Sequence, residues 1–241
     1  MAKVDLRGDI VPNDIKWIYD WLEWDATCPN DIRDVITNMQ PGEQLEVFIN
    51  SGGGDVQSGQ EMYSLFQTVD SVAKIQSFAA SAAGVAAMGC KKVLMSDVGT
   101  IMIHNVSCSG ASGDYHQMEK ITDMLKVLNE TMANAYVSKS GMTLEDVLKL
   151  MDRETWISAK GAIKYGFADG MLEPEDMRVS DSNSLTFSNR VAPVQLENRT
   201  AFGLRLTEEI KQQVIAEKNK KDADEKLKNE ILNDLDNYGT A

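Results

Sequence analysis

One junction in the sequence constrains the fold more than any other: a strand-like segment runs into small residues and then into an apolar helix. Residues 72–78 alternate apolar and polar positions, as a strand with one buried face does. After Ala79 and Ala80 comes Ser81, and residues 82–89 are all small or apolar, which is typical of a helix buried on every side. The pattern predicts a unit of an α/β fold with Ser81 at the helix N-terminus.

Short strands and helices alternate along most of the chain. Strands are expected at 47–50, 72–78, 92–95 and 100–104, and helices at 13–24, 30–39, 58–68, 82–89, 114–138, 143–151 and 159–165. Thr143 followed by Asp146 resembles a capping box, and Gly141 can end the helix before it. We therefore predict one α/β domain over residues 1–174.

The character of the sequence changes after Pro174. Residues 175–206 are polar and turn-prone, which predicts a linker or a loosely ordered arm. Residues 207–241 are rich in charge and carry a weak apolar stripe, which predicts a charged tail, partly helical or disordered. We expect a helix in this tail to pack against scaffold proteins or sibling subunits.

Composition excludes several classes of function. A net charge of −13 argues against a nucleic-acid partner, because phosphate binding needs clustered Lys and Arg. Two histidines and scattered carboxylates without ligand spacing do not predict a metal site. Three cysteines without a C-x-x-C pair favour a reduced, cytoplasmic setting. The chain has no apolar run of roughly 18 residues, so no membrane-spanning helix is expected, and residues 1–14 lack the apolar core of a signal peptide.

Ser81 can act as a nucleophile from its place at a helix N-terminus. Free backbone N–H groups and the positive end of the helix dipole lie there, and both suit a developing oxyanion. An N-cap serine on a core helix is the common alternative, and this segment alone leaves both open.

The glycine run Gly52-Gly53-Gly54 follows a strand-like segment at 45–49. Glycines at a strand end allow positive φ and close approach of the backbone to a ligand, so this loop can supply an oxyanion N–H. A phosphate-binding loop is a weak rival because no G-K-[ST] follows. A tight turn remains the simple alternative.

His104 ends an apolar strand, where it can project into a cleft and take the proton of Ser81. A structural histidine is the alternative, whereas His116 is expected to be solvated. Asp152 and Glu154 precede the helix at 159–165, and either carboxylate can orient the imidazole. Ordinary surface charge near a helix start is the other interpretation.

Together these segments resemble the proteolytic subunit of the Clp peptidases. Four blocks match in order: Phe48-Ile49-Asn50-Ser51-Gly52-Gly53-Gly54, Ala79-Ala80-Ser81-Ala82-Ala83, Ile101-Met102-Ile103-His104, and Trp156-Ile157-Ser158-Ala159 with Ala162-Ile163-Lys164-Tyr165-Gly166-Phe167-Ala168-Asp169. The match spans about residues 5–172 and keeps the interval of 23 residues between Ser81 and His104.

The resemblance implies an α/β fold, the spiral of ββα units shared with crotonases, with the helix at 114–138 as a handle that builds rings. It implies that Ser81 is the nucleophile and His104 the general base, and that the N–H groups of Gly54 and Ala82 form the oxyanion hole. The third triad position falls on Glu154, where the family usually has Asp, with Asp152 as the fallback. No metal or organic cofactor is implied.

Some features are more similar to the Clp-like head-maturation peptidases of tailed phages. Gly52 replaces the usual Pro, Ala82 stands where the housekeeping enzyme commonly has Met, and the housekeeping subunit has no counterpart of the tail. This branch implies a serine endopeptidase that matures capsids in the bacterial host cytoplasm, as a homo-oligomeric ring acting on polypeptides alongside capsid scaffold proteins.

Three alternatives stay open. The first is a housekeeping proteolytic subunit fed by an AAA+ unfoldase. The second is a crotonase-type enzyme acting on acyl-CoA, which the pairing of Ser81 with His104 argues against. The third is a non-catalytic scaffold that keeps the peptidase fold.

Overall fold

The computed structural model describes residues 1–21, 23–108, 110–173, 215–216 and 219–220. Backbone contacts divide the chain into two units, Met1–Gly203 and Leu204–Ala241, and every element named below lies in the first. The linker expected at 175–206 lies outside the described residues. So does the tail expected at 207–241 with its predicted packing, apart from four residues.

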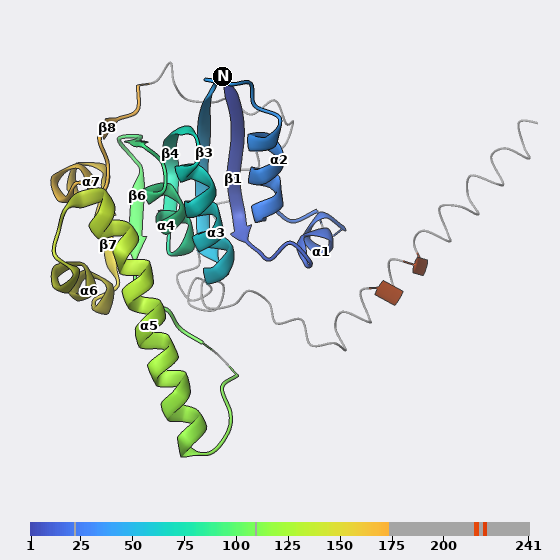
Figure 1. Ribbon diagram of the computed structural model, residues 1–241, viewed down its shortest axis with the longest axis vertical. Coiled ribbons are helices and arrows are strands. Elements are labelled where there is room, and N and C mark those ends of the chain that lie inside the picture. The colour runs from blue at the N-terminus through green and yellow to red at the C-terminus, as the bar shows by residue number, and fades with distance from the viewer. Residues whose placement is uncertain (22, 109, 174–214, 217–218, 221–241) are drawn as a thin grey trace, which may run out of the picture. The chain divides into compact units, whose positions relative to one another are not determined.

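A largely parallel β-sheet forms the centre of the first unit (Figure 1). The strands are β1 (Ala2–Ile10), β2 (Ala26–Thr27), β3 (Gln44–Gly54), β4 (Asp70–Ala80), β5 (Lys92–Met95), β6 (Thr100–Ile103), β7 (Thr155–Ser158) and β8 (Gly170–Met171). Their order is β2-β1-β3-β4-β5-β8, and β6 joins the C-terminal part of β4. Only the β6–β7 ladder is antiparallel among the pairs described.

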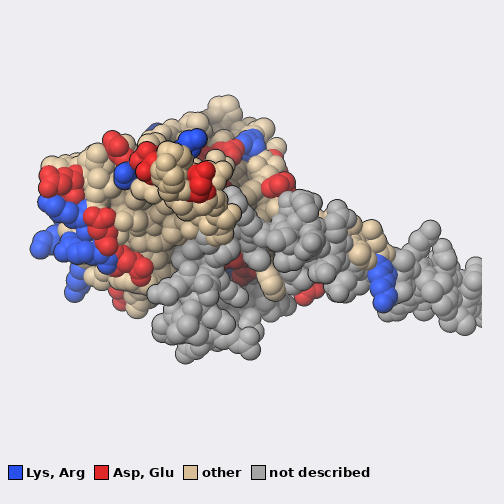
Figure 2. Space-filling model, turned by 90° about the horizontal axis from the view of Figure 1, so that it is seen from below, with Lys and Arg blue, Asp and Glu red and all other residues tan. Residues whose placement is uncertain are grey.

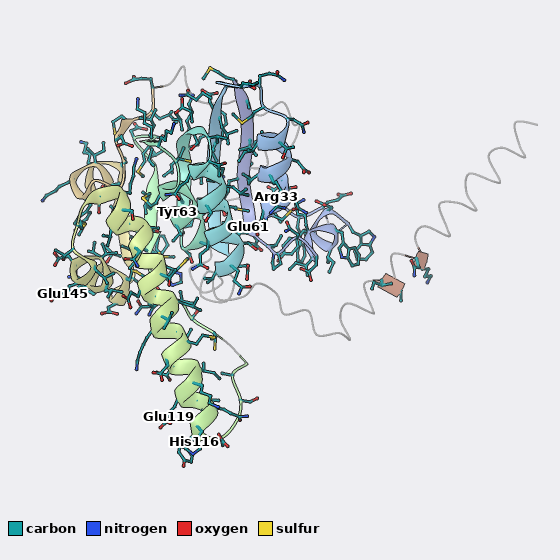
Figure 3. All side chains as sticks on the ribbon, in the orientation of Figure 1. Arg33, Glu61, Tyr63, His116, Glu119 and Glu145 are labelled. Carbon is teal, nitrogen blue, oxygen red and sulfur yellow. The ribbon has the colours of Figure 1, made fainter. Side chains whose placement is uncertain are left out.

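Helices follow most of the strands. They are α1 (Lys16–Trp21), α2 (Pro29–Thr37), α3 (Val56–Gln67), α4 (Ala82–Met88), α5 (Tyr115–Ser140), α6 (Leu144–Asp152) and α7 (Ala159–Tyr165). In Figure 1, α2 lies beside β1 and α3 in front of β3, whereas α5 extends well beyond the end of the sheet. An exposed ion pair between Arg33 and Glu61 joins α2 to α3 (Figure 3).

The alternation of strands and helices predicted from the sequence is confirmed, and the boundaries differ in places. The strand at 92–95 has the predicted limits, and the helix predicted at 114–138 runs from Tyr115 to Ser140. Gly141 ends that helix with φ 73°. Thr143 caps α6 by accepting from the Asp146 N–H, but the Asp146 carboxylate accepts from the Thr143 hydroxyl and not from the backbone.

The sequence analysis missed β1, β7 and the two-residue strands β2 and β8. In β1 the buried apolar positions Val4, Leu6 and Ile10 alternate with charged residues, so the segment has the pattern of a strand with one buried face. Asp and Gly are uncommon in strands, but pairing with β3 holds the segment in the sheet. The helix predicted at 13–24 shrinks to Lys16–Trp21, and the positive φ of Glu23, 57°, is incompatible with a continued helix.

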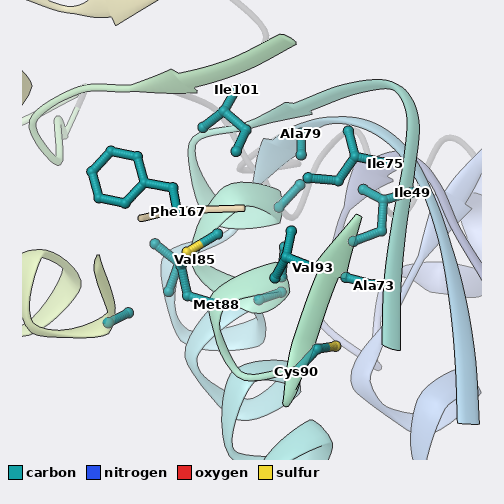
Figure 4. Packing of buried hydrophobic residues seen from close by; sticks show 14 of the residues in the cluster. Ile49, Ala73, Ile75, Ala79, Val85, Met88, Cys90, Val93, Ile101 and Phe167 are labelled. Carbon is teal, nitrogen blue, oxygen red and sulfur yellow. The ribbon is translucent and has the colours of Figure 1, made fainter. Parts of the chain in front are cut away.

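Helix α4 lies in the middle of the core. All of its residues are buried, and Figure 4 shows Val85 and Met88 packed among Val93, Ile101 and Phe167. Its small residues allow close neighbours: a Cβ atom on Gly59 of α3 would come within 2.8 Å of the Ala82 Cβ atom. This packing fixes the start of α4 relative to the sheet, and with it the position of Ser81.

Candidate active site

Ser81 lies at the junction between β4 and α4 in an unusual backbone conformation. Its angles are φ 53° and ψ −125°, a strained region for a residue other than glycine. Two backbone hydrogen bonds hold it there: Ser81 N donates to Met102 O at 2.8 Å, and Val85 N donates to Ser81 O at 3.1 Å. The strand, the neighbouring strand β6 and the helix therefore impose this conformation together.

The Ser81 hydroxyl does not cap α4. No hydrogen bond joins it to the helix backbone, and its Oγ atom lies 2.7 Å from Nε2 of His104. An N-cap serine would instead accept a hydrogen bond from a backbone N–H in the first turn. The geometry thus favours a nucleophile–base pair over the capping alternative.

His104 reaches Ser81 because β4 and β6 are parallel neighbours. Ala80 pairs with Met102, so the ends of both strands deliver the two side chains to one edge of the sheet. Burial lowers the pKa of His104 below its ordinary value, and the charge of Glu154 opposes this shift in part. The imidazole is therefore neutral near pH 7 and can accept a proton.

His116 lies far from this pair, at the end of α5 that points away from the sheet (Figure 3). Its side chain is 63% exposed and lies 3.7 Å from Glu119, as expected for a solvated histidine. Only one of the two histidines of the sequence therefore lies beside a candidate nucleophile.

The two candidate acids have different partners, and Asp152 ends α6 whereas Glu154 lies in the turn before β7. Glu154 has φ 47°, and its charge opposes the lowering of the His104 pKa by burial. Asp152 accepts a hydrogen bond from the Asn105 side chain at 2.9 Å. No hydrogen bond within the described part of the chain joins His104 to either carboxylate. His104 is therefore linked to Glu154 by its charge, while the Asp152 carboxylate is bound by Asn105, the residue after the histidine.

Two aromatic residues near the site were not singled out from the sequence. Trp156 Nε1 donates to Glu154 Oε1 at 3.3 Å, and the Trp156 ring stacks on Phe78 with centroids 5.7 Å apart and planes 12° from parallel. Glu154 lies in the turn just before β7 and Trp156 lies within β7, so their contact depends on the positive φ of Glu154, which the sequence did not predict.

The glycine run lies against the nucleophile. Gly53 has φ 89°, and a Cβ atom there would come within 2.6 Å of Ala80 O and 2.8 Å of Ser81 Cβ. Gly54 has φ 149°, and a Cβ atom there would come within 2.2 Å of Ile10 O in β1. The close packing on both sides explains why β3 ends in glycines and not in larger residues. Gly52 has open space around it instead.

Nothing in the described part of the chain offers an obvious metal or thiol site. No group of three His, Cys, Asp or Glu side chains there could hold a metal ion. The cysteines are free thiols, and burial raises the pKa of Cys90 to about 12, far from a reactive thiolate. On the face shown in Figure 2, Lys and Arg lie among Asp and Glu. Of the described helices, none is long and apolar enough to cross a membrane.

Comparison with known proteins shows the family of the chain. The family model "Clp protease" matches residues 33–175, more than half of the chain. The ATP-dependent Clp protease proteolytic subunit of Bacteroides fragilis is 30% identical over 141 residues, which cover 57% of this chain and 68% of the relative. Subunit 1 from Cutibacterium acnes and the subunit from Porphyromonas gingivalis are each 29% identical over 142 residues, 57% of this chain and 66% and 64% of the relatives. The chain thus spans about two thirds of these relatives, and it belongs to the Clp protease family.

Proposed function

We propose that this protein is a serine endopeptidase that hydrolyses peptide bonds in polypeptides, with Ser81 as the nucleophile and His104 as the general base. One observation carries the proposal: Ser81 Oγ lies 2.7 Å from His104 Nε2 while Ser81 is held in a strained conformation at a helix N-terminus. Membership of the Clp protease family supports peptidase activity.

The reaction follows from these positions. His104 takes the hydroxyl proton as Ser81 attacks the carbonyl carbon of the scissile peptide bond, which gives a tetrahedral oxyanion. His104 then returns the proton to the leaving amine, and an acyl-enzyme remains. Water, deprotonated by His104, releases the carboxylic acid and restores the Ser81 hydroxyl.

We assign the oxyanion hole to the N–H groups of Gly54 and Ala82. Ala82 is the first residue of α4, where backbone N–H groups have no partner within the helix. The N–H of Gly53 already donates to Ser51 Oγ at 3.1 Å. Because Gly53 packs against Ser81, the next amide along the chain, that of Gly54, is the one we assign to the oxyanion.

Glu154 is our choice for the third member of the triad. Its charge acts on the pKa of His104, as an acid that stabilises the imidazolium should. Asp152 remains the fallback, and its bond to Asn105 argues against it.

The biological role we propose is capsid maturation by a phage-encoded enzyme, in the cytoplasm of a bacterial host. The sequence departures at Gly52 and Ala82 support this role, as do the residues beyond 175, where the family match ends. A homo-oligomeric ring working with capsid scaffold proteins follows from it. Housekeeping degradation with an AAA+ unfoldase is the second candidate, because the curated relatives are named as subunits of an ATP-dependent protease.

A degradation assay separates these two roles. The full chain is incubated with an unfolded protein, with and without a Clp ATPase and ATP. Cleavage that depends on the ATPase would favour the housekeeping role. Cleavage of a co-expressed capsid scaffold protein without any ATPase would favour maturation.

The activity itself is tested by labelling with a fluorophosphonate probe, read by intact mass. We expect one adduct per wild-type chain and none on Ser81→Ala or His104→Ala, with losses of at least about 10⁴-fold in rate. No adduct on a folded, assembled wild type would favour the non-catalytic scaffold. Turnover of an acyl-CoA thioester would favour the crotonase-type alternative.

A further inference from the structure

The carboxylate of Glu154 has a contact that the proposed mechanism does not use. Trp156 Nε1 donates a hydrogen bond to Glu154 Oε1 at 3.3 Å. In the antiparallel β6–β7 ladder, Met102 pairs with Trp156 and Ile103 pairs with Thr155. His104 directly follows Ile103 and Glu154 directly precedes Thr155, so the two residues leave this ladder at the same end.

The indole is itself held in place. Its ring stacks on Phe78, which lies in β4 three residues before Ser81. A stacked ring of this size has little freedom to rotate, so its N–H has a defined direction. Phe78 and Trp156 thus connect the strand that carries the nucleophile to the carboxylate that acts on the base.

We propose that Trp156 is a positioning residue for Glu154. Its indole N–H holds one carboxylate oxygen, and the second oxygen stays available to accept from Nδ1 of His104, since a carboxylate has lone pairs on both oxygens. The inference rests on the proposed function, because it takes His104 as the base and Glu154 as the acid. Glu has one more rotatable bond than Asp and needs a further contact to hold its charge in one place.

The exposure of Trp156 permits a different explanation, which the experiment must separate. The side chain is 50% exposed, so its ring could serve only as a contact with another molecule. A positioning role makes two demands that a surface contact does not. The effect of removing the indole N–H must depend on the Glu154 carboxylate, and it must change the pH dependence of a reaction at Ser81.

The test uses the full chain and the fluorophosphonate probe. Rates of Ser81 labelling are measured against pH for wild type, Trp156→Phe, Glu154→Gln and the double variant. Phenylalanine keeps an aromatic ring beside Phe78 but has no N–H to donate. Trp24→Phe is the matched control, because Trp24 is 53% exposed and packs edge-on to Tyr19, outside the site.

We expect Trp156→Phe to label about 3- to 10-fold more slowly at neutral pH, the size of effect that loss of one hydrogen bond has. The fall of its labelling rate on the acid side should move to lower pH, as in Glu154→Gln. A displaced carboxylate no longer favours the protonated form of the His104 imidazole. The double variant should match Glu154→Gln alone, and Trp24→Phe should match wild type.

Each contrary outcome has a distinct meaning. If Glu154→Gln slows labelling but Trp156→Phe matches wild type, the positioning role is wrong and the proposed function stands. If the Trp156→Phe loss persists undiminished in the Glu154→Gln background, the indole acts by another route and the inference fails. If Glu154→Gln has no effect, the third triad assignment fails first. Absence of labelling in wild type would overturn the proposed function itself.

A second variant keeps the inference testable if Trp156→Phe does not fold. Phe78→Leu removes the stacking partner and leaves the indole N–H in place. We expect a smaller loss in the same direction, and no further loss when it is combined with Glu154→Gln. An equal loss in both backgrounds would contradict the proposal.

Discussion

Ser81 and Glu154 both have positive φ angles, 53° and 47°, yet their surroundings differ in almost every respect. Ser81 follows buried residues of β4 and precedes a helix whose every residue is buried. Glu154 lies in a turn after α6, where its side-chain contacts include an indole that is half exposed. The packed core holds Ser81 in its positive-φ conformation, whereas exposed side chains contact Glu154.

This difference predicts how the two halves of the site respond to substitution. Around Ser81, a change in volume must disturb packed neighbours, so activity and stability should fall together. Around Glu154, a side chain can move into solvent, so activity should change with little loss of stability. The four predictions below test this contrast.

The largest effect is expected at the acid. Glu154→Gln should lower the rate of Ser81 labelling by about 10²- to 10⁴-fold, because the amide cannot stabilise the imidazolium. Asp152→Asn should cost less than about tenfold, since it alters only the bond to Asn105. Labelling rates measure the loss of activity in the two variants, and a thermal melt on the same samples measures their stability. A larger loss in Asp152→Asn than in Glu154→Gln would show that Asp152, and not Glu154, is the third member of the triad.

The next effect concerns stability on the nucleophile side. Gly53→Ala should lower the free energy of unfolding by about 3 kcal/mol, because the new Cβ atom would meet Ala80 and Ser81 at a positive φ. It should also slow labelling. Gly52→Ala is the control, because it has open space around it. Equal urea midpoints for the two variants would contradict the packing argument.

The pH dependence gives a smaller effect. Burial lowers the pKa of His104 from its ordinary value of 6.5, and only the neutral imidazole can take the Ser81 proton. The labelling rate should therefore fall with pH only below 6.5, as pH passes through the lowered pKa. Glu154→Gln removes the opposing charge and should move this limb lower still. A limb that moved upward would mean that water had entered the site.

The smallest effect is expected in the core beneath α4. The Tyr136 hydroxyl is fully buried and has no hydrogen-bond partner among the described residues, and burial raises its pKa. Tyr136→Phe should keep the edge-on contact with Phe167 and raise stability by about 1 kcal/mol. Tyr115→Phe, at an exposed position, should change nothing. A lower melting temperature for Tyr136→Phe would show that the hydroxyl binds a buried water.

The contrast also explains which parts of the site could be predicted from the sequence. The geometry around Ser81 follows from local order, since a strand, small residues and an apolar helix appear consecutively. His104 could be placed because parallel neighbours end at the same edge of a sheet. Trp156 and Phe78 could not be placed, because their contact depends on the pairing of β7 with β6, far apart in the chain.

The fold shows the same limit. β5, with three apolar residues in succession, was predicted with correct bounds, whereas β3 and β4 extend beyond the predicted segments at both ends. β1 was missed although its apolar and charged residues alternate, because it contains Asp and Gly, which are uncommon in strands, and pairing with β3 decides such a case. The two-residue strands β2 and β8 carry too little sequence to be predicted at all.

Those two short strands have a consequence for assembly. They lie at the two ends of the main strand order, and β2 pairs with only Asp9 and Ile10 of β1. The outer edge of β1 from Ala2 to Gly8 therefore has no strand beside it among the described residues. Lys3, Asp5 and Arg7 lie on this part of β1, and charged side chains on an edge strand disfavour pairing with a strand of another molecule. Because β2 is so short, the protection of this edge against aggregation falls to charge.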